Sequence, residues 1–351
     1  MQCGAGGAER RGRPVTTRAK RGRFGKRKAA LATDRVGDET GFGETGDAEK
    51  PVRRHLFAAG KAMGRQQEVN RGTGQRLQHD RGFSPAGRRG TSTQMSEMEI
   101  FDRRAVAAHR TRAAPLLAKV RPVLDEIASR VLDRLDDTGR RFRLALDVGG
   151  RGAVAPLLNG RGIDVITCDV SPALAAVKVG VAGDPEFLPF GPARFDLIIA
   201  HMSLHWVNDL PGVLIQLRQA LTPDGLFLGS LPLLGTLSEL RSALIEAEEI
   251  LTGGAAPRVS PFPTLADCAG LMQRAGFALP IAERDEVDLE YAEPFALLHD
   301  LRDAGETNAL SARSRRIPPR DLFPMALASM ARHGGRLRVN LPIAVVSGWG
   351  S

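Results

Sequence analysis

The stretch from residue 144 to residue 169 limits the possible folds of this chain more than any other. It opens with a short apolar run that contains Asp147, and a glycine-rich turn follows directly. Apolar residues then recur at helical spacing as far as Asn159, and a second apolar run ends in Asp169. The order strand, glycine turn, helix, strand and acid is typical of the first unit of a sheet that binds a nucleotide at its carboxyl edge.

The charge of Asp147 indicates which nucleotide this turn can hold. A dinucleotide places its pyrophosphate at the N-terminus of the helix, where a neighbouring carboxylate would repel it. S-adenosylmethionine has no phosphate, and its ammonium and sulfonium cations suit an acid at this position. We therefore predict that Asp147, Gly149 and Gly150 hold the amino-acid end of S-adenosylmethionine. Asp169, followed by Val170, is expected to accept the hydrogen bonds of the ribose hydroxyls.

The glycine turn differs from the pattern Asp-x-Gly-x-Gly-x-Gly, because Arg151 and Ala153 stand at its second and third glycine places. An ordinary strand–turn–helix unit with a capping aspartate is therefore the alternative to a cofactor site. Asp184 and Pro185 lie in the loop before the next apolar run. We expect this loop to accept a hydrogen bond from the adenine amino group.

Charge divides the chain near residue 94. Residues 1–94 contain 21 Lys and Arg against 9 Asp and Glu, whereas the rest contains 28 against 31. The first segment has few aliphatic residues and no periodicity, so we expect a disordered basic extension. This segment has three possible interpretations: a nucleic-acid-binding tail, a transit peptide, or a translated upstream region before a start at Met95 or Met98. The last of these is favoured. Nucleic-acid binding by the folded part is not expected.

The cysteines of the whole chain indicate a protein of a reducing compartment. The three cysteines (Cys3, Cys168 and Cys268) have spacings typical of neither a disulfide framework nor a metal site. No apolar run is long enough to span a bilayer. We therefore expect a cytoplasmic location, or the mitochondrial matrix if the extension is a transit peptide.

Apolar runs and amphipathic segments alternate from residue 95 onward. Residues 116–135 predict a helix that Pro122 kinks, and residues 95–140 are expected to form a helical cap. The alternation in 141–351 predicts an α/β fold, a Rossmann-like, doubly wound and mostly parallel sheet with a helical insertion at 294–333. The expected elements are helices at 171–180, 210–221, 236–253 and from Thr264, and strands at 195–200, 226–229, 281–291 and 338–350.

Several motifs carry a family resemblance. They are MEIFDR at 98–103, LDVG at 146–149, EFLPF at 186–190, SLHWVNDLP at 203–211, LTPDGLFLG at 221–229, TLSELR at 236–241, GETN at 305–308 and GW at 348–349. With them the chain resembles class I S-adenosylmethionine-dependent methyltransferases of the type-11 group. Within this group it is most similar to the mitochondrial complex I assembly factors of methyltransferase fold and their bacterial relatives.

The resemblance implies an enzyme that uses S-adenosylmethionine and has a class I methyltransferase fold. Methyl transfer to a protein of respiratory complex I is the main interpretation. Arginine hydroxylation of a complex I subunit and a non-catalytic assembly role are the alternatives, because one fold supports many functions.

The loop after the strand at 195–200 is where methyltransferases of this class present residues to the substrate. His205 is the candidate general base, and Trp206 is placed to form a wall beside the sulfonium. The alternative for this pair is packing at the start of the next helix. Iron is a further alternative, with His201, His205 and Asp209 as ligands, but their spacing in one loop does not form a convincing facial set. No metal is therefore predicted.

Overall fold

Eight strands form one mixed sheet in the described residues, which are 99–177 and 179–350 of a computed structural model. The strand order is β3-β2-β1-β4-β5-β8-β6, and β7 pairs with β8. Strands β1 to β5 are parallel, whereas β8 is antiparallel to its neighbours. The strands are β1 (Leu144–Val148), β2 (Asp164–Asp169), β3 (Gly180–Ala182), β4 (Phe195–His201), β5 (Leu221–Pro232), β6 (Ala278–Tyr291), β7 (Arg332–His333) and β8 (Arg336–Trp349).

The sheet confirms the predicted α/β fold, and its order locates a site. The chain moves from β1 through β2 to β3 on one side and continues with β4 and β5 on the other side. Ligands of such sheets bind at the carboxyl ends of the strands where the order reverses, which here is beside β1 and β4. The predicted extension at residues 1–94 lies outside the described residues.

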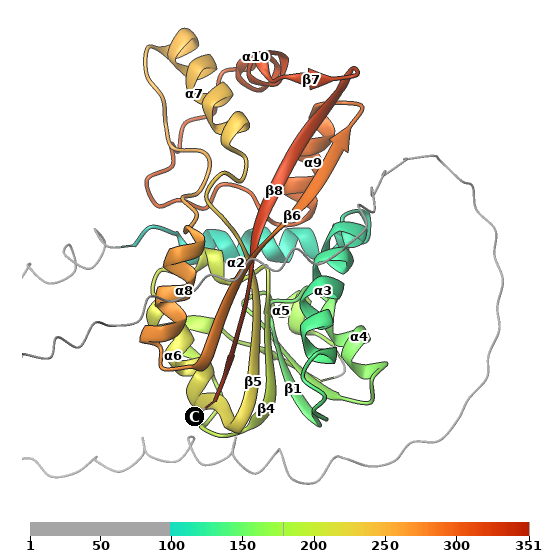
Figure 1. Cartoon of the computed structure of the whole chain (residues 1–351). Coiled ribbons are helices and arrows are strands. Elements are labelled where there is room, and N and C mark those ends of the chain that lie inside the picture. The colour runs from blue at the N-terminus through green and yellow to red at the C-terminus, as the bar shows by residue number, and fades with distance from the viewer. Residues whose placement is uncertain (1–98, 178, 351) are drawn as a thin grey trace, which may run out of the picture. The chain divides into compact units, whose positions relative to one another are not determined.

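Helices cover both faces of the sheet (Figure 1). Figure 1 places α3 and α4 on one face and α6 and α8 on the other. The α-helices are α2 (Arg103–Ala113), α3 (Arg121–Asp136), α4 (Val154–Asn159), α5 (Pro172–Ala175), α6 (Leu210–Ala220), α7 (Ser238–Thr252), α8 (Leu265–Arg274), α9 (Phe295–Asp303) and α10 (Leu322–Ser329). Short 3-10 helices are η1 (Ala114–Lys119), η2 (Pro185–Phe187) and η3 (Leu204–Trp206).

Two apolar cores result from the alternation of side chains along the central strands. Leu146 of β1 and Ile198 of β4 belong to the core under α6 and α8. Ala145 and Leu197, each one residue earlier, belong to the core under α3 and α4. Both faces of these strands are buried, and their residues are apolar except for Asp147, Asp196 and His201, as expected for a covered parallel sheet.

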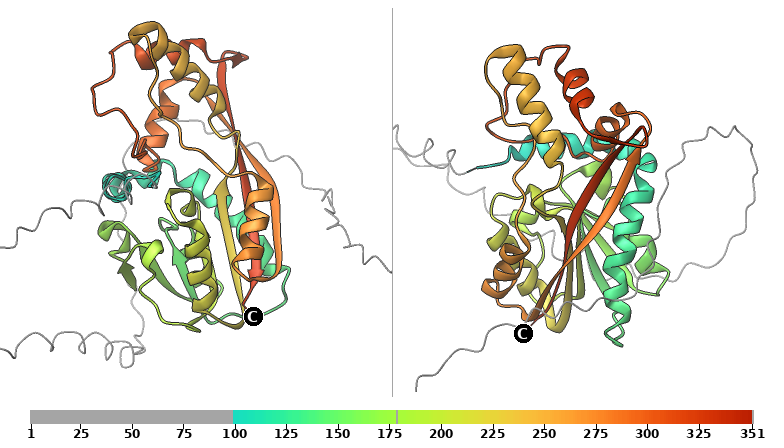
Figure 2. Two further views of the ribbon diagram at one scale, coloured as in Figure 1. Left: turned by 90° about the vertical axis from the view of Figure 1, so that its left-hand side faces the viewer. Right: turned by 45° about the horizontal axis from the view of Figure 1, so that its top comes forward.

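A third core lies beyond the main sheet. Strands β6 and β8 have 14 residues each, and β5 pairs only with the half of β8 from Ile343 to Trp349. The other half pairs with β6 and β7 and extends past the carboxyl end of β5 as a ribbon. Figures 1 and 2 show α7, α9 and α10 gathered around this ribbon, and their apolar residues form the third core with Tyr291, Leu337 and Val339.

Several predicted boundaries were wrong for local reasons. Pro122 lies in the first turn of α3, where proline is favoured, so it begins a helix after η1 instead of kinking one. The helix after Ser171 ends at Ala175, and Gly180 begins β3. Thr236 does not cap α7, because its hydroxyl donates to the carbonyl oxygen of Pro342 at 3.3 Å and the helix begins two residues later.

Other local predictions were met in part or in full. Residues 304–321, inside the segment predicted to be helical, form no helix between α9 and α10. By contrast, Thr264 does cap α8, with Asp267 completing a capping box. The alternating segment 281–291 is part of β6, as predicted.

Candidate active site

The turn after β1 requires glycine at two positions. Gly149 has a φ of 64°, and a Cβ added to it would lie 2.6 Å from the Cβ of Ser203. A Cβ added to Gly150 would lie 2.1 Å from Oδ1 of Asp147. The backbone can therefore approach a ligand here only because both residues lack a side chain. Arg151 follows with a φ of 51°, and its side chain is buried instead of facing solvent.

Asp147 is fully buried at the end of β1. Neither carboxylate oxygen makes a hydrogen bond of normal geometry with the described residues. Burial, followed by the charge of Asp169, raises the pKa of Asp147 to about 7, although the N–H groups of Gly150 and Ala155 act in the opposite direction. An acid in this state lacks a cationic partner, which is the property expected of a site for an ammonium group.

Asp169 ends β2 and is already paired. Its Oδ2 accepts a hydrogen bond from Nη1 of Arg110 at 3.0 Å, and its Oδ1 accepts one from the backbone N–H of Ser171 at 2.8 Å. Arg110 comes from α2 and is 3% exposed, and it also donates to the carbonyl oxygen of Gly149 at 3.2 Å. The ion pair therefore lies where the ribose was predicted to bind.

Asp184 is paired in the same way by the same helix. Nε of Arg103, also on α2, donates to Oδ2 of Asp184 at 3.0 Å. The other oxygen of Asp184 accepts from the N–H of Glu186 at 2.9 Å and thereby caps η2. The guanidinium carbon of Arg103 lies 4.8 Å from the centre of the Phe187 ring. Helix α2 thus holds both acids that were predicted to contact the nucleoside.

The predicted cofactor residues surround a small cavity of about 40 Å³. Gly149, Asp169, Val170, Asp184 and Pro185 line this cavity, whereas Asp147 and Gly150 are not among its lining residues. The acid at the glycine turn and the two acids on the nucleoside side fit the charges and hydroxyls of S-adenosylmethionine. The volume is far smaller than a drug-sized ligand site of roughly 300–1,000 Å³, so the arginines of α2 must move before the cofactor can enter.

A polar cluster lies beside this cavity and is centred on Glu306. Its Oε2 accepts from Nε1 of Trp206 at 2.7 Å and lies 2.8 Å from Nε2 of His205. Its Oε1 accepts from Nη1 of Arg151 at 2.5 Å. Arg151 also donates to the carbonyl oxygens of Met202 at 2.8 Å and Ala304 at 2.9 Å. The cluster therefore joins the glycine turn, η3 and the loop after α9.

The electrostatics of the cluster keep Glu306 ionised. Burial raises the pKa of Glu306, but the charges of His205 and Arg151 and the hydrogen bond with His205 lower it by more, so the pKa lies well below its usual range. His205 is 6% exposed, and its Nδ1 has no hydrogen-bonding partner among the described residues. When the ring is neutral, the carboxylate at Nε2 favours the tautomer with its proton on Nε2, and Nδ1 is then an acceptor.

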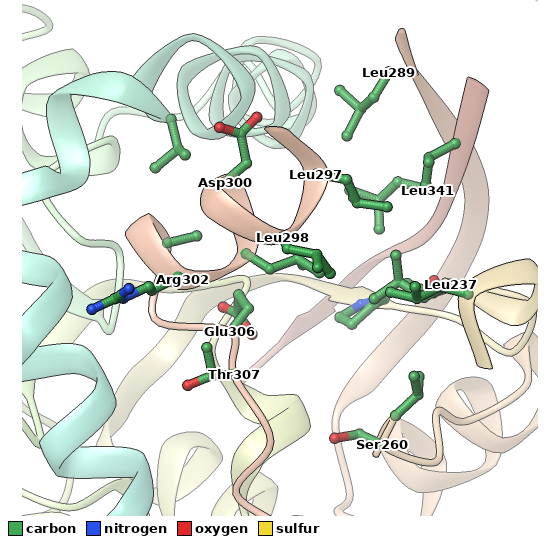
Figure 3. A pocket seen from close by; sticks show the side chains of 18 of the residues that line it. Leu237, Ser260, Leu289, Leu297, Leu298, Asp300, Arg302, Glu306, Thr307 and Leu341 are labelled. Carbon is green, nitrogen blue, oxygen red and sulfur yellow. The ribbon is translucent and has the colours of Figure 1, made fainter. Parts of the chain in front are cut away.

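A second, larger cavity of about 610 Å³ opens on the other side of this cluster. Trp206 lines both cavities, and His205, Glu306 and Arg151 line only the larger one. Figure 3 shows Leu237, Leu298 and Leu341 around the same space, with Glu306 and Thr307 at one side of it. Of the predicted catalytic pair, Trp206 thus lies between a candidate cofactor cavity and a candidate acceptor cavity, and His205 lines the acceptor cavity.

The three residues considered as iron ligands have separate roles. His201 is fully buried, its Nδ1 lies 3.0 Å from Oγ of Ser230, and burial lowers its pKa to about 3. Asp209 caps α6 by accepting from the N–H of Gly212. Across residues 99–177 and 179–350, no group of three or more His, Cys, Asp and Glu side chains is arranged to hold a metal ion. No helix in these ranges is both long and apolar enough to cross a membrane.

Sequence reasoning missed three residues of the site, Arg110, Arg151 and Glu306, although each left a signal. Arg110 occupies the buried side of α2 with Val106 and Ala113, at helical spacing. Arg151 was noted only as a departure from the glycine pattern, and Glu306 only as part of the GETN motif at 305–308. A buried arginine between apolar helix positions indicates an internal carboxylate partner.

Comparisons with known proteins identify a family for this chain. A family model described as a methyltransferase domain matches residues 104–280. The human protein named arginine-hydroxylase NDUFAF5, mitochondrial, is 40% identical over 238 residues, which cover 65% of this chain and 68% of that protein. The malonyl-[acyl-carrier protein] O-methyltransferase of Xylella fastidiosa is 34% identical over 244 residues, covering 66% and 81%. The solved structure of the Bacillus subtilis YcgJ protein covers 63% of this chain and 98% of its own, with 14% identity and a TM-score of 0.44.

The family model covers the glycine turn, both nucleoside-side acids and the His205–Trp206 pair. The relatives from human and Xylella fastidiosa extend the match to most of their own lengths. The chain therefore belongs to the methyltransferase domain family, the S-adenosylmethionine-dependent enzymes of class I fold.

Proposed function

We propose that this enzyme transfers a methyl group from S-adenosylmethionine to an acceptor that binds beside His205. The observation that carries this proposal is that Trp206 lines both the cavity at the glycine turn and the cavity of about 610 Å³, with His205 beside it in the larger one. S-adenosylmethionine supplies an electrophilic methyl group. The chain has to bind the cofactor, align the acceptor and accept its proton.

The proposed cofactor residues divide the ligand among three strand ends. Asp147 with Gly149 and Gly150 holds the ammonium end, because Asp147 is a buried acid without a cationic partner. Asp169 and Val170 hold the ribose side. Asp184 and Pro185 hold the adenine side, once α2 releases the acids. Trp206, which lines both cavities, forms the wall beside the sulfonium.

His205 is the proposed general base, and Glu306 is its positioning residue. Nδ1 of His205 is buried and has no partner in the described chain, so it can accept a proton from an acceptor group. The ionised Glu306 at Nε2 fixes the ring and stabilises the imidazolium that forms, as a carboxylate does in other acid–base dyads.

A second candidate is arginine hydroxylation, because the mitochondrial relatives are named arginine-hydroxylases, and its proposed substrate is a complex I subunit. Under either reaction we propose a complex I subunit as the protein partner. The same relatives are named mitochondrial, so the mitochondrial matrix has support that the predicted cytoplasmic location lacks. A non-catalytic assembly role is the outcome if neither reaction occurs.

The test uses methyl-labelled S-adenosylmethionine, the purified full chain and an extract of cells that lack it, with and without oxygen. Methyl transfer predicts a labelled acceptor and S-adenosylhomocysteine under both conditions. Loss of the reaction without oxygen, with an oxygen added to an arginine, supports hydroxylation instead. Asp169→Asn is the variant expected to lose cofactor binding, and Asp133→Asn, exposed on α3, is the matched control. If the purified chain binds S-adenosylmethionine but no molecule of the extract gains the label, the proposal is contradicted.

A further inference from the structure

The larger cavity has the size of a small-molecule site. Its volume of about 610 Å³ is within the range of roughly 300–1,000 Å³ for ligand pockets. At about 30 Å³ for each non-hydrogen atom, the volume of a water molecule in the liquid, it holds about 20 such atoms. The cofactor has its own cavity at the glycine turn, so this space belongs to a second ligand.

The larger cavity has an apolar wall of leucines, while its polar side chains include Arg151, His205 and Glu306. Leu237, Leu240 and Leu244 come from α7 and the residue before it, and Leu298 comes from α9. Strands β6 and β8 add further leucines, of which Leu341 is in view in Figure 3. Such walls favour an aliphatic or aromatic body, because a buried polar group without a partner is destabilising.

Two histidines that line this cavity, His109 and His205, each have a buried Nδ1 without a hydrogen-bonding partner among the described residues. Nδ1 of His205 is buried, faces no described partner, and belongs to a side chain that lines the cavity. Since Nε2 is held by Glu306, Nδ1 can accept a hydrogen bond from a ligand hydroxyl. The polar end is therefore built for a group that donates a proton.

The carboxylates of the cavity are not available to a guanidinium. Glu306 already binds Arg151, His205 and Trp206. Asp300, the other lining acid, is hydrogen-bonded with Tyr291. A peptide segment would also bring backbone N–H and C=O groups against the leucine side chains of the cavity, which cannot hydrogen-bond with them. Both observations favour a small molecule over an arginine-bearing peptide.

We propose that the methyl acceptor is an apolar molecule of up to about 20 non-hydrogen atoms that carries a hydroxyl group directed at His205. This inference rests on the proposed methyl transfer. The hydroxyl oxygen bonds to the methyl carbon and the carbon–sulfur bond of the sulfonium breaks, with its electron pair remaining on sulfur. The hydroxyl proton passes to Nδ1 of His205 and leaves to solvent after product release.

The test measures ligand binding through Trp206, one of the two tryptophans of the chain. Trp349→Phe leaves Trp206 as the only tryptophan. This substitution should not disturb the cavities, because Trp349 lies at the end of β8 against Arg140 and lines neither of them. The probes are 4-octylphenol and octylbenzene, which differ in the hydroxyl. Both should change the Trp206 fluorescence saturably, and the phenol should bind about 2- to 13-fold more tightly, the effect of one net hydrogen bond.

Leu298→Gln should weaken binding of both probes by at least about fivefold, because an amide without a partner enters the apolar wall. Leu157→Gln is the matched control, since Leu157 is 37% exposed on α4. His205→Leu should abolish the preference for the phenol while octylbenzene still binds. With S-adenosylmethionine present, the phenol should become its methyl ether.

The outcomes separate this inference from the proposed function. No saturable fluorescence change in a protein that binds S-adenosylmethionine by calorimetry overturns the inference and leaves methyl transfer standing. Equal probe affinities of Leu298→Gln and Leu157→Gln also overturn the inference. Methylation of protein residues alone, with the phenol left unmodified, overturns it as well. Saturable probe binding with no cofactor binding supports the cavity assignment and contradicts the methyl-transfer proposal.

Discussion

Replacing Asp147 with asparagine tests the buried acid on which the cofactor assignment depends. Burial raises the pKa of Asp147 from 3.8 to about 7, so the folded protein binds this proton more tightly than the unfolded chain. The stability that this group contributes is therefore complete below pH 4 and is lost as the pH rises through about 7. Between pH 5 and pH 8 the loss is roughly 2–3 kcal/mol, since each pKa unit corresponds to about 1.4 kcal/mol.

Asp147→Asn keeps the shape and removes the titration, so its free energy of unfolding relative to the wild type should rise by that amount over the same range. Urea unfolding at four pH values, followed by circular dichroism, measures the difference. A difference that stays constant from pH 5 to pH 8 refutes the reasoning, and Asp133→Asn should give such a constant difference. In the wild type, S-adenosylmethionine should displace the proton from Asp147. Its affinity should therefore increase about tenfold for each unit by which the pH rises, up to about pH 7. Asp147→Asn should lose this pH dependence.

Three further outcomes are expected. Arg110→Ala leaves Asp169 without its buried partner, so it should lower stability by about 3–5 kcal/mol while speeding S-adenosylmethionine association in stopped-flow measurements. Glu306→Gln should lower turnover and shift its pH profile, because His205 loses an ionised partner, whereas calorimetry should find cofactor affinity unchanged. Leu132→Ala, at a side chain 1% exposed on α3, should cost about 2–5 kcal/mol in urea unfolding without changing the affinity for the cofactor.

The parts of the site that sequence could predict are local in the chain. Asp147, Gly149 and Asp169 follow one another within a single strand–turn–helix–strand unit, so spacing alone relates them. The Arg110–Asp169 pair spans 59 positions and the His205–Glu306 pair spans 101, and no periodicity connects such distant residues. These contacts depend on where α2 and the loop after α9 pack. Tertiary packing also explains why Thr236 does not cap α7 as its sequence pattern predicts. Its hydroxyl donates a hydrogen bond to the carbonyl oxygen of Pro342 instead.

The projecting half of the β6–β8 ribbon has a consequence for how the molecule opens. A two-stranded ribbon is only marginally stable by itself, so this part persists because α7, α9 and α10 cover it with their own core. Such a segment forms a cooperative unit that can unfold locally at a free energy below that of the whole protein. Transient opening of this unit would admit and release the ligand of the larger cavity while the hydrogen bonds of β1 and β4 remain intact. In amide hydrogen exchange, residues 336–342 would then exchange earlier than β4.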